Sequence, residues 1–316
     1  MNRSLIGILF VCLFPSLVWS QNSILMVDSG NDRIWQLNAF DGSLINNSFI
    51  TNPGTFSTPK GIAVTAASHI LVSDQISDSV YEFSPTGAFL GILAGPSNGL
   101  DNIRGITVRG NHFYVTVGGN TGGLNNTIQR FNLDGTGQVT WASTNMNSPF
   151  DILFRDNDAL ISNSGNHLIQ QYDLTGSFLN TFHSGSIRFP QQMINDGTNV
   201  VVAGFSPPTG VYQYNASGVQ VDFDAVNTGL RGIIRLGNGL LLWTGGTRYG
   251  TLDPTTGSVV DLGNITGANF QYLAAFAAVP EPATVALISA AVALPVAVVW
   301  RRRMKCKGAK YRRIAK

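Results

Sequence analysis

The sequence predicts an all-β fold, and three observations lead to that prediction. A short motif recurs along the body of the chain at intervals of 40 to 46 residues. Each copy precedes an apolar strand, a polar loop, a strand of alternating polar and apolar residues, and a turn that contains glycine. Both cysteines, Cys12 and Cys306, lie near the chain ends, so no disulfide holds the body together. Four short strands in a unit of this length are typical of a propeller blade, so we expect a six-bladed β-propeller of four-stranded blades.

The recurring motif marks the first strand of each blade. Its clearest copies are residues 59–64 and 103–108, in which Lys60-Gly61-Ile62 matches Arg104-Gly105-Ile106. Weaker copies begin near Pro149, Pro190 and Leu230. The positions equivalent to Gly61 are Gly105, Asp151, Gln192 and Gly232, and one further interval of 41 residues reaches Leu273.

A strand of alternating polar and apolar residues follows later in each unit. Five such strands align, at residues 34–37, 80–83, 128–131, 169–172 and 211–214. Period-two alternation with aromatic and β-branched residues predicts half-buried strands. A tight turn follows each of them and one sixth strand, with its glycine at Gly42, Gly87, Gly135, Gly176, Gly218 and Gly257. We expect a positive φ at these glycines.

The two ends of the body complete one blade. The first unit, residues 24–49, has no copy of the recurring motif, whereas residues 272–276 after the sixth unit are an unmatched first strand. Strand exchange between the N- and C-terminal ends would close the ring and remove its exposed edges. A seven-bladed ring is the competing architecture, but the sequence contains no stretch that supplies the extra blade.

Two loops carry a family resemblance. Residues 27–34 (Val-Asp-Ser-Gly-Asn-Asp-Arg-Ile) and 162–169 (Ser-Asn-Ser-Gly-Asn-His-Leu-Ile) resemble the loop of the NHL repeat, a propeller module shared with the streptogramin-lyase-like group. The resemblance covers most of residues 23–276 and implies a propeller. It also raises an alternative function, a divergent propeller hydrolase or lyase of the streptogramin-lyase or lactonase type.

The residues for that alternative chemistry are hard to find in the sequence. Glu82 is the only glutamate of the body, and the residues at its position in other units are Gln36, Arg130, Gln171 and Gln213, which favours the solvated side of a strand. His69 and His112 occupy the same turn in two units, His167 lies in the repeat loop, and His183 is expected on an outer strand. We therefore predict no catalytic residue, no metal site and no cofactor.

Residues 1–20 have the layout of a secretory signal peptide. Arg3 precedes an apolar stretch from Leu5 to Val18, and Ser20 provides a small residue at the expected cleavage point. We therefore expect export by Sec-type machinery and a propeller domain at residues 21–278.

Residues 279–316 form a three-part tail. The motif Pro280-Glu281-Pro282 precedes an uncharged stretch at 283–300, which is long enough to cross a membrane as a helix, and Arg301, Arg302 and Arg303 follow as a stop signal. Residues 304–316 are expected to form a basic cytoplasmic tail. The order of residues 279–303 resembles the PEP-CTERM sorting signal, which implies a sorting protease of the exosortase type as a partner. The protein is then anchored in the membrane by this tail, or lies at the cell surface or outside the cell after processing.

The charge of the chain divides between body and tail. The chain has 20 basic and 18 acidic residues, but the body, residues 21–280, has ten basic and 17 acidic residues, a net charge of about −7. Because binding to nucleic acid depends on a basic face, we expect no nucleic-acid partner.

One set of residues predicts a binding site. The residue before each Gly61-equivalent position lies at the start of a first strand, and these strands surround the channel of a propeller. The set, one residue per blade, is Lys60, Arg104, Phe150, Gln191, Arg231 and Tyr272. Cations and aromatic rings on one channel rim would hold an anionic or sugar-like ligand. In the alternative interpretation, these side chains only pair with nearby aspartates and cap the ring.

These observations predict an exported, surface-sorted propeller that acts as a non-enzymatic binding or scaffold protein. The resemblance of the tail implies an association with extracellular polysaccharide, with a polysaccharide or a surface protein as partner.

Overall fold

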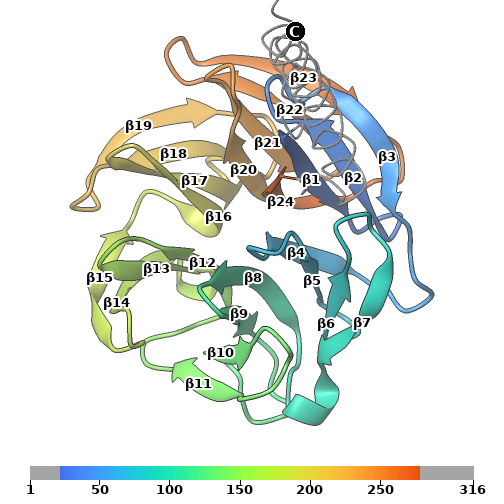
Figure 1. The fold of residues 1–316 in the computed structure, drawn as a ribbon. Helices are drawn as coiled ribbons and strands as arrows, with labels where there is room; N and C mark the ends of the chain where they lie inside the picture. The colour runs from blue at the N-terminus through green and yellow to red at the C-terminus, as the bar shows by residue number, and fades with distance from the viewer. Residues whose placement is uncertain (1–21, 278–316) are drawn as a thin grey trace, which may run out of the picture.

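The computed structural model describes residues 22–277, which form six four-stranded sheets arranged as a ring (Figure 1). The predicted all-β, six-bladed propeller of four-stranded blades is confirmed. The predicted signal peptide, sorting motif, membrane-spanning segment 283–300 and basic tail lie outside the described residues. Within residues 22–277, no helix is long and apolar enough to cross a membrane.

Each blade is an antiparallel sheet whose four strands lie side by side, from the innermost strand at the channel to the outermost strand at the edge of the ring. Blade 1 comprises β24 (Phe270–Ala277), β1 (Asn22–Asp28), β2 (Arg33–Asn38) and β3 (Leu44–Ile50). Blade 2 comprises β4 (Pro59–Val64), β5 (Ile70–Asp74), β6 (Ser79–Phe83) and β7 (Phe89–Ala94). Blade 3 comprises β8 (Ile103–Arg109), β9 (His112–Val117), β10 (Thr127–Asn132) and β11 (Val139–Ala142).

The second half of the ring repeats this order. Blade 4 comprises β12 (Pro149–Phe154), β13 (Asp158–Asn163), β14 (Leu168–Asp173) and β15 (Phe178–Ser184). Blade 5 comprises β16 (Arg188–Asp196), β17 (Asn199–Ser206), β18 (Gly210–Tyr214) and β19 (Gln220–Ala225). Blade 6 comprises β20 (Gly232–Arg235), β21 (Leu241–Gly245), β22 (Arg248–Asp253) and β23 (Ser258–Asn264). Two short 3₁₀ turns, η1 (Pro96–Asn98) and η2 (Ser164–Asn166), lie between strands.

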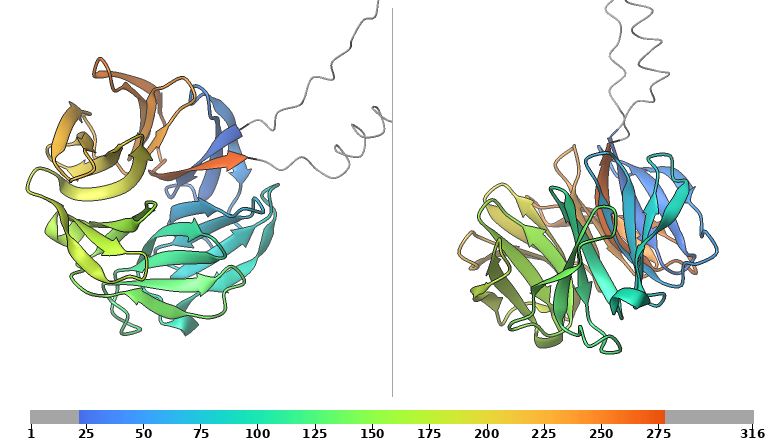
Figure 2. Two further views of the ribbon diagram at one scale, coloured as in Figure 1. Left: turned by 60° about the vertical axis from the view of Figure 1, so that its left-hand side comes forward. Right: turned by 60° about the horizontal axis from the view of Figure 1, so that its bottom comes forward.

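Blade 1 is built from both ends of the described chain. Strand β1 pairs antiparallel with β24, from Asn22 opposite Ala277 to Asp28 opposite Phe270. Figure 2 shows the two ends of the described chain leaving the ring side by side.

The turns and the core follow from the repeat. The six turn glycines, Gly42, Gly87, Gly135, Gly176, Gly218 and Gly257, all have positive φ values between 69° and 94°, as the sequence predicts. In the described chain, one apolar cluster fills each of the six interfaces between neighbouring blades. The alternating strands supply several of the largest side chains in these clusters, such as Tyr81 and Phe83 between blades 1 and 2. The hydrophobic core is therefore a ring of six layers around the channel.

The first strands of neighbouring blades meet at main-chain distance. A Cβ atom on Gly61 of β4 would lie 2.5 Å from the carbonyl oxygen of Arg104 in β8 and 2.6 Å from Ser73 Oγ. Gly105 and Gly232 likewise face the main chain of the next blade. The recurring glycine is therefore needed because another backbone occupies the space of its side chain.

Hydroxyl groups on the second strands form hydrogen bonds with main-chain groups of both blades at these contacts. Ser73 Oγ accepts a hydrogen bond from the Gly61 N–H (3.1 Å) and donates one to the Arg104 carbonyl. Thr244 Oγ1 does the same between the Gly232 N–H (2.9 Å) and the carbonyl of Gln271 in blade 1. One buried hydroxyl thus satisfies two main-chain groups on two blades, which would otherwise be unpaired.

Replacing Gly61 by alanine is expected to destabilise the ring. The new methyl group meets the main chain of β8 as well as the Ser73 hydroxyl, so moving one side chain cannot make room for it and the blades must move apart. We expect a loss of about 2 kcal/mol in the free energy of unfolding in urea, and a melting temperature lower by roughly 4 to 8 °C. Gly91→Ala on the outer strand β7 is the matched control, because nothing lies within 4 Å of its Cβ position. Equal stability of the two variants would contradict the close approach of β4 and β8.

Candidate functional site

The six residues predicted at the channel rim lie around the start of the innermost strands. Lys60, Arg104, Phe150, Gln191 and Tyr272 belong to β4, β8, β12, β16 and β24, and Arg231 directly precedes β20. Each blade therefore contributes one residue. All of them are buried except Arg231, which is half-buried. They form a closed cluster in the channel rather than an open rim; we call it the channel cluster.

Phe150 is the centre of contact for two of the cations. The Lys60 Nζ atom lies 5.3 Å from the centroid of its ring, and the Arg104 guanidinium carbon lies 4.2 Å from it. Arg104 Nη1 also donates a hydrogen bond to Ser148 Oγ (2.6 Å). A cation over an aromatic face is attracted by the ring quadrupole, and more strongly where water is excluded.

The third cation, Arg231, packs against a different aromatic ring. The Arg231 guanidinium carbon lies 4.4 Å from the ring centroid of Phe205. Phe189 stands between Phe205 and Phe150, with ring centroids 5.6 Å and 5.0 Å away. The guanidinium groups of Arg104 and Arg231 are thus positioned by one continuous set of rings.

Tyr272 crosses the channel. Its hydroxyl group donates a hydrogen bond to the Phe150 carbonyl (3.1 Å), which joins blade 1 to blade 4 on the opposite side of the ring. Burial raises the pKa of Tyr272 well above its ordinary value, so the hydroxyl stays protonated and acts as a donor.

Within residues 22–277, no carboxylate pairs with the channel cations. Among the described residues, the ion pairs of Asp and Glu involve Arg33, His69, Arg155, Arg235 and Arg248, and none involves Lys60, Arg104 or Arg231. The interpretation in which these residues pair with aspartates is therefore wrong for residues 22–277. Burial, with the charges of Arg231 and Arg104 nearby, lowers the pKa of Lys60 well below its ordinary value. Burial also lowers the pKa of both arginines.

Several polar atoms of the channel cluster lack partners within the described chain. Both amide atoms of Gln191 are buried without a hydrogen bond, and so are Arg104 Nε and Arg231 Nε. Gln191 has 0% of its surface exposed. Buried polar atoms are nearly always hydrogen-bonded in folded proteins, so this group of donors and acceptors fits a small polar occupant.

Asp151 and Gln192 replace the recurring glycine in blades 4 and 5. Asp151 is buried, and its Oδ2 accepts a hydrogen bond from the Met193 N–H (2.8 Å). Gln192 Oε1 accepts from the N–H groups of Ile233 and Leu273 (both 3.1 Å). Their side chains thus add links between blades, and at Gln192 these links accompany a main-chain hydrogen bond from its N–H to the Arg231 carbonyl (3.2 Å). Burial raises the pKa of Asp151 to about 7, which places a carboxyl group near neutral titration beside the channel cluster.

The other acid–base residues lie elsewhere. Glu82 is half-buried, and its Oε1 atom lies 2.7 Å from His69 Nδ1. It therefore does not simply face solvent as the sequence predicts. His183 lies on the outermost strand β15, as predicted, and pairs with Ser186 Oγ (2.8 Å). Within residues 22–277, no group of three or more His, Cys, Asp or Glu side chains is arranged to hold a metal ion.

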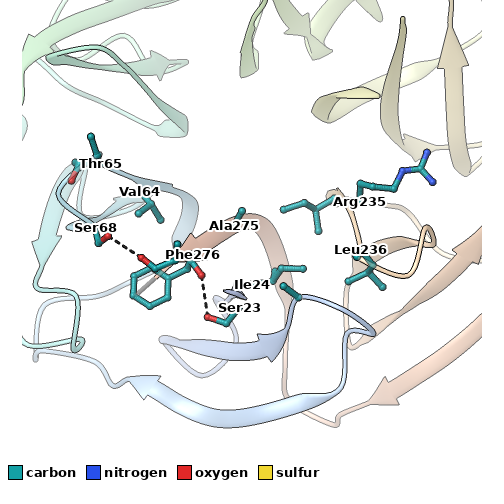
Figure 3. Close-up of a pocket in the computed structure, with 14 residues that line it drawn as sticks. Ser23, Ile24, Val64, Thr65, Ser68, Arg235, Leu236, Ala275 and Phe276 are labelled. Atoms are coloured by element: carbon teal, nitrogen blue, oxygen red, sulfur yellow. Dashed lines mark hydrogen bonds between the residues drawn. The ribbon is translucent and has the colours of Figure 1, made fainter. Parts of the chain in front are cut away.

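Two grooves open at the other end of the inner strands. The first, of about 560 Å³, lies beside the ends of β4, β20 and β24 and is mostly apolar, with Val64, Leu236 and Phe276 in its lining (Figure 3). The second, of about 550 Å³, is polar and lies at the ends of β12 and β16, with Arg155 and Asp158 in its lining. No residue of the channel cluster lines either groove.

Solved structures with the same fold come from proteins of different kinds. A chain of a nidogen–laminin complex matches with a TM-score of 0.70 and 14% identity, over 81% of this chain and 98% of that one. A protein of unknown function from Bacteroides caccae matches with a TM-score of 0.59 and 17% identity, over 81% and 99%. A gluconolactonase from Xanthomonas campestris matches with a TM-score of 0.54 and 17% identity, over 68% and 78%. Identities this low show the fold alone. No protein-family model matches the chain, and the comparison with curated proteins gives no match.

Asp151→Asn is expected to change how stability depends on pH. The folded state keeps the Asp151 proton up to about pH 7, whereas the unfolded chain loses it near pH 4, so the wild type loses stability as the pH rises between these values. Asparagine still accepts the Met193 N–H but does not titrate. We expect equal stability near pH 4 and an advantage for the variant on the order of 4 kcal/mol at pH 8, measured by urea unfolding.

Asp173→Asn provides the control for this measurement. Asp173 lies in an exposed turn, where hydrogen bonds from Thr175 and Ser177 lower its pKa, so its substitution changes the pH dependence in the opposite direction. A difference between Asp151→Asn and wild type that is the same at every pH would show that Asp151 is not held protonated.

Proposed function

We propose that the protein is an exported, surface-sorted β-propeller that binds an anionic ligand in its channel and acts as a non-enzymatic binding or scaffold protein. One observation carries the proposal: Lys60, Arg104 and Arg231 come from three blades to one buried cluster and form no ion pair within the described chain. Holding like charges together is unfavourable unless an anion joins them.

An acidic saccharide suits this site. Guanidinium groups bind carboxylates through paired, charge-assisted hydrogen bonds, and the adjacent aromatic rings offer apolar faces to a sugar ring. The resemblance of the tail to the PEP-CTERM signal supports extracellular polysaccharide as the source of the ligand. A surface protein that presents an acidic group is the other partner consistent with these residues.

The location in this proposal rests on the chain ends. The layout of residues 1–20 supports export by Sec-type machinery, and Pro280-Glu281-Pro282 with Arg301-Arg302-Arg303 supports sorting by an exosortase-type protease. The segment 283–300 holds the protein in the membrane until it is cut.

A hydrolase or lyase is the second candidate function. It is favoured by the two perturbed groups at the channel, since burial brings the pKa of Asp151 to about 7 and lowers that of Lys60. Clusters of perturbed groups are frequent at catalytic sites, although structural burial also produces them. The Met193 N–H already binds the Asp151 carboxylate, which favours a structural role for this residue.

Substitution of the channel arginines tests the binding function. We expect Arg104→Met and Arg231→Met each to weaken the binding of oligogalacturonate about tenfold, because each removes a charge-assisted hydrogen bond to the ligand. Calorimetry on the full-length protein gives the affinities. Arg248→Met is the matched control, since Arg248 pairs with Asp261 on the outer strands. Equal affinities for all three variants, or equal binding of a neutral oligosaccharide, would exclude the proposed channel site.

Mass spectrometry of the C-terminus tests the sorting step. In the native cell, we expect mature protein to end close to Pro282 and to lack the basic tail, because the motif and the stop signal resemble those of processed proteins. Replacing Glu281 by glutamine removes the acidic residue of the motif and is expected to leave the tail in place. A wild-type protein that retains Lys316 after export would argue against processing.

A further inference from the structure

Lys60 has a distinctive position among the lysines of this chain. It is the only lysine in residues 22–277, and the other four, Lys305, Lys307, Lys310 and Lys316, belong to the basic tail. Its side chain is 4% exposed, lies against the Phe150 ring and forms no ion pair with another described residue. Arg104 and Arg231 are close enough to affect its titration.

We propose that Lys60 Nζ forms a reversible imine with a small oxo acid, an aldehyde or ketone that carries a carboxylate, and that Arg104 and Arg231 hold this carboxylate. The proposal deepens the proposed function, on which it rests, by naming the chemical class of the channel ligand. An oxo acid has both groups that this cluster can engage. Its carboxylate can bind the guanidinium groups, and its carbonyl carbon can react with the amine.

The reaction balances without a further reactant. The lone pair of the neutral amine attacks the carbonyl carbon, and the carbonyl π electrons move to oxygen, which gives a carbinolamine after proton transfer from nitrogen to oxygen. The carbon–oxygen bond then breaks, the oxygen leaves as water with the second amine proton, and a carbon–nitrogen double bond forms. No atom is oxidised or reduced. Hydrolysis reverses the steps.

The surroundings of Lys60 favour the reactive form of the amine. At pH 7 an ordinary lysine with a pKa near 10.4 has only about one amine in 2,500 uncharged. Burial and the two arginines lower the pKa of Lys60 well below its ordinary value, so a much larger fraction is uncharged. The packed channel also limits access of water, which would hydrolyse the imine.

The size of the ligand follows from the packing. Tyr272 crosses the channel to the Phe150 carbonyl, so a ligand can present only one end of its chain to Lys60 and cannot pass through the channel. The unpartnered amide of Gln191 offers a donor and an acceptor to a small polar molecule in that space. A two- or three-carbon oxo acid, or the oxo-acid end of a longer saccharide, meets both conditions.

Reductive trapping tests the proposal on the full-length chain. Protein that retains its tail is incubated at pH 7 with glyoxylate and sodium cyanoborohydride, which reduces an imine to a stable secondary amine, and each lysine is assayed by peptide mass spectrometry. We expect Lys60 to be modified at least about tenfold faster than the tail lysines, which are internal controls. Modification of Lys60 at the rate of the tail lysines, or none, would overturn the proposal.

A neutral aldehyde tests the role of the arginines. With propanal in place of glyoxylate, the ratio of Lys60 modification to tail modification is expected to fall, because propanal has no carboxylate. Arg104→Met and Arg231→Met are expected to lower the glyoxylate ratio to the propanal value. Lys60→Arg keeps the positive charge and is expected to lose the adduct at this position. Preference for Lys60 that is equal for both aldehydes would overturn the proposal, since the arginines would then play no part.

The experiments distinguish rejection of the imine from rejection of the proposed binding function. Arginine-dependent binding of oligogalacturonate without trapping at Lys60 would reject the imine and leave the binding function in place. Absence of any arginine-dependent binding, of oligogalacturonate or of glyoxylate, would reject both. Thermal unfolding of every variant distinguishes loss of the ligand from loss of the fold.

Discussion

The close approach of the six innermost strands is the constraint on which the rest of the structure depends. Where β4 meets β8, the carbonyl of Arg104 occupies the place of a side chain on Gly61, and the Ser73 hydroxyl joins the two main chains. Because side chains alternate along a strand, a residue that faces the next blade is preceded by one that faces elsewhere, here the channel. The same contact that closes the ring therefore brings Lys60, Arg104 and their equivalents together on its axis.

The buried basic side chains of the channel are unfavourable for the stability of the folded protein. Apolar side chains at the same positions would fill the channel without the desolvation cost of buried cations. The molecule instead retains a lysine and two arginines, positions the arginines with Phe150, Phe189 and Phe205, and leaves the Gln191 amide without partners among the described residues. Other buried polar atoms of the described chain, such as Trp243 Nε1, also lack partners, but only the channel cluster combines them with unpaired basic side chains, a combination expected where function opposes stability.

Local patterns were sufficient to predict the blades but not the contacts between them. Alternation and turn glycines are properties of neighbouring residues, so the strands and the positive φ values at residues such as Gly42 and Gly257 could be predicted. The hydrogen bond from Tyr272 to Phe150 joins residues 122 positions apart, and no repeating pattern in the sequence predicts it. The structural roles of Asp151 and Gln192 were also missed, although their departure from glycine was a signal. Burial of the channel cluster could not be predicted either, because it depends on how tightly six distant strands converge.

The channel cluster lies away from Ala277, the last described residue of the chain. Tyr272 and Ala277 lie on one strand, β24, five residues apart, which is a distance of about 17 Å along an extended chain. Asn22 pairs with Ala277, so both ends of the described chain leave from the same end of the inner strands, beside the apolar groove. In the proposed topology, the tail that follows Ala277 is bound at that end while Lys60 and the arginines lie toward the other. Because Ala277, from which the tail continues, lies about 17 Å along β24 from Tyr272, we expect that cutting the tail would change where the domain is held without changing the proposed ligand site.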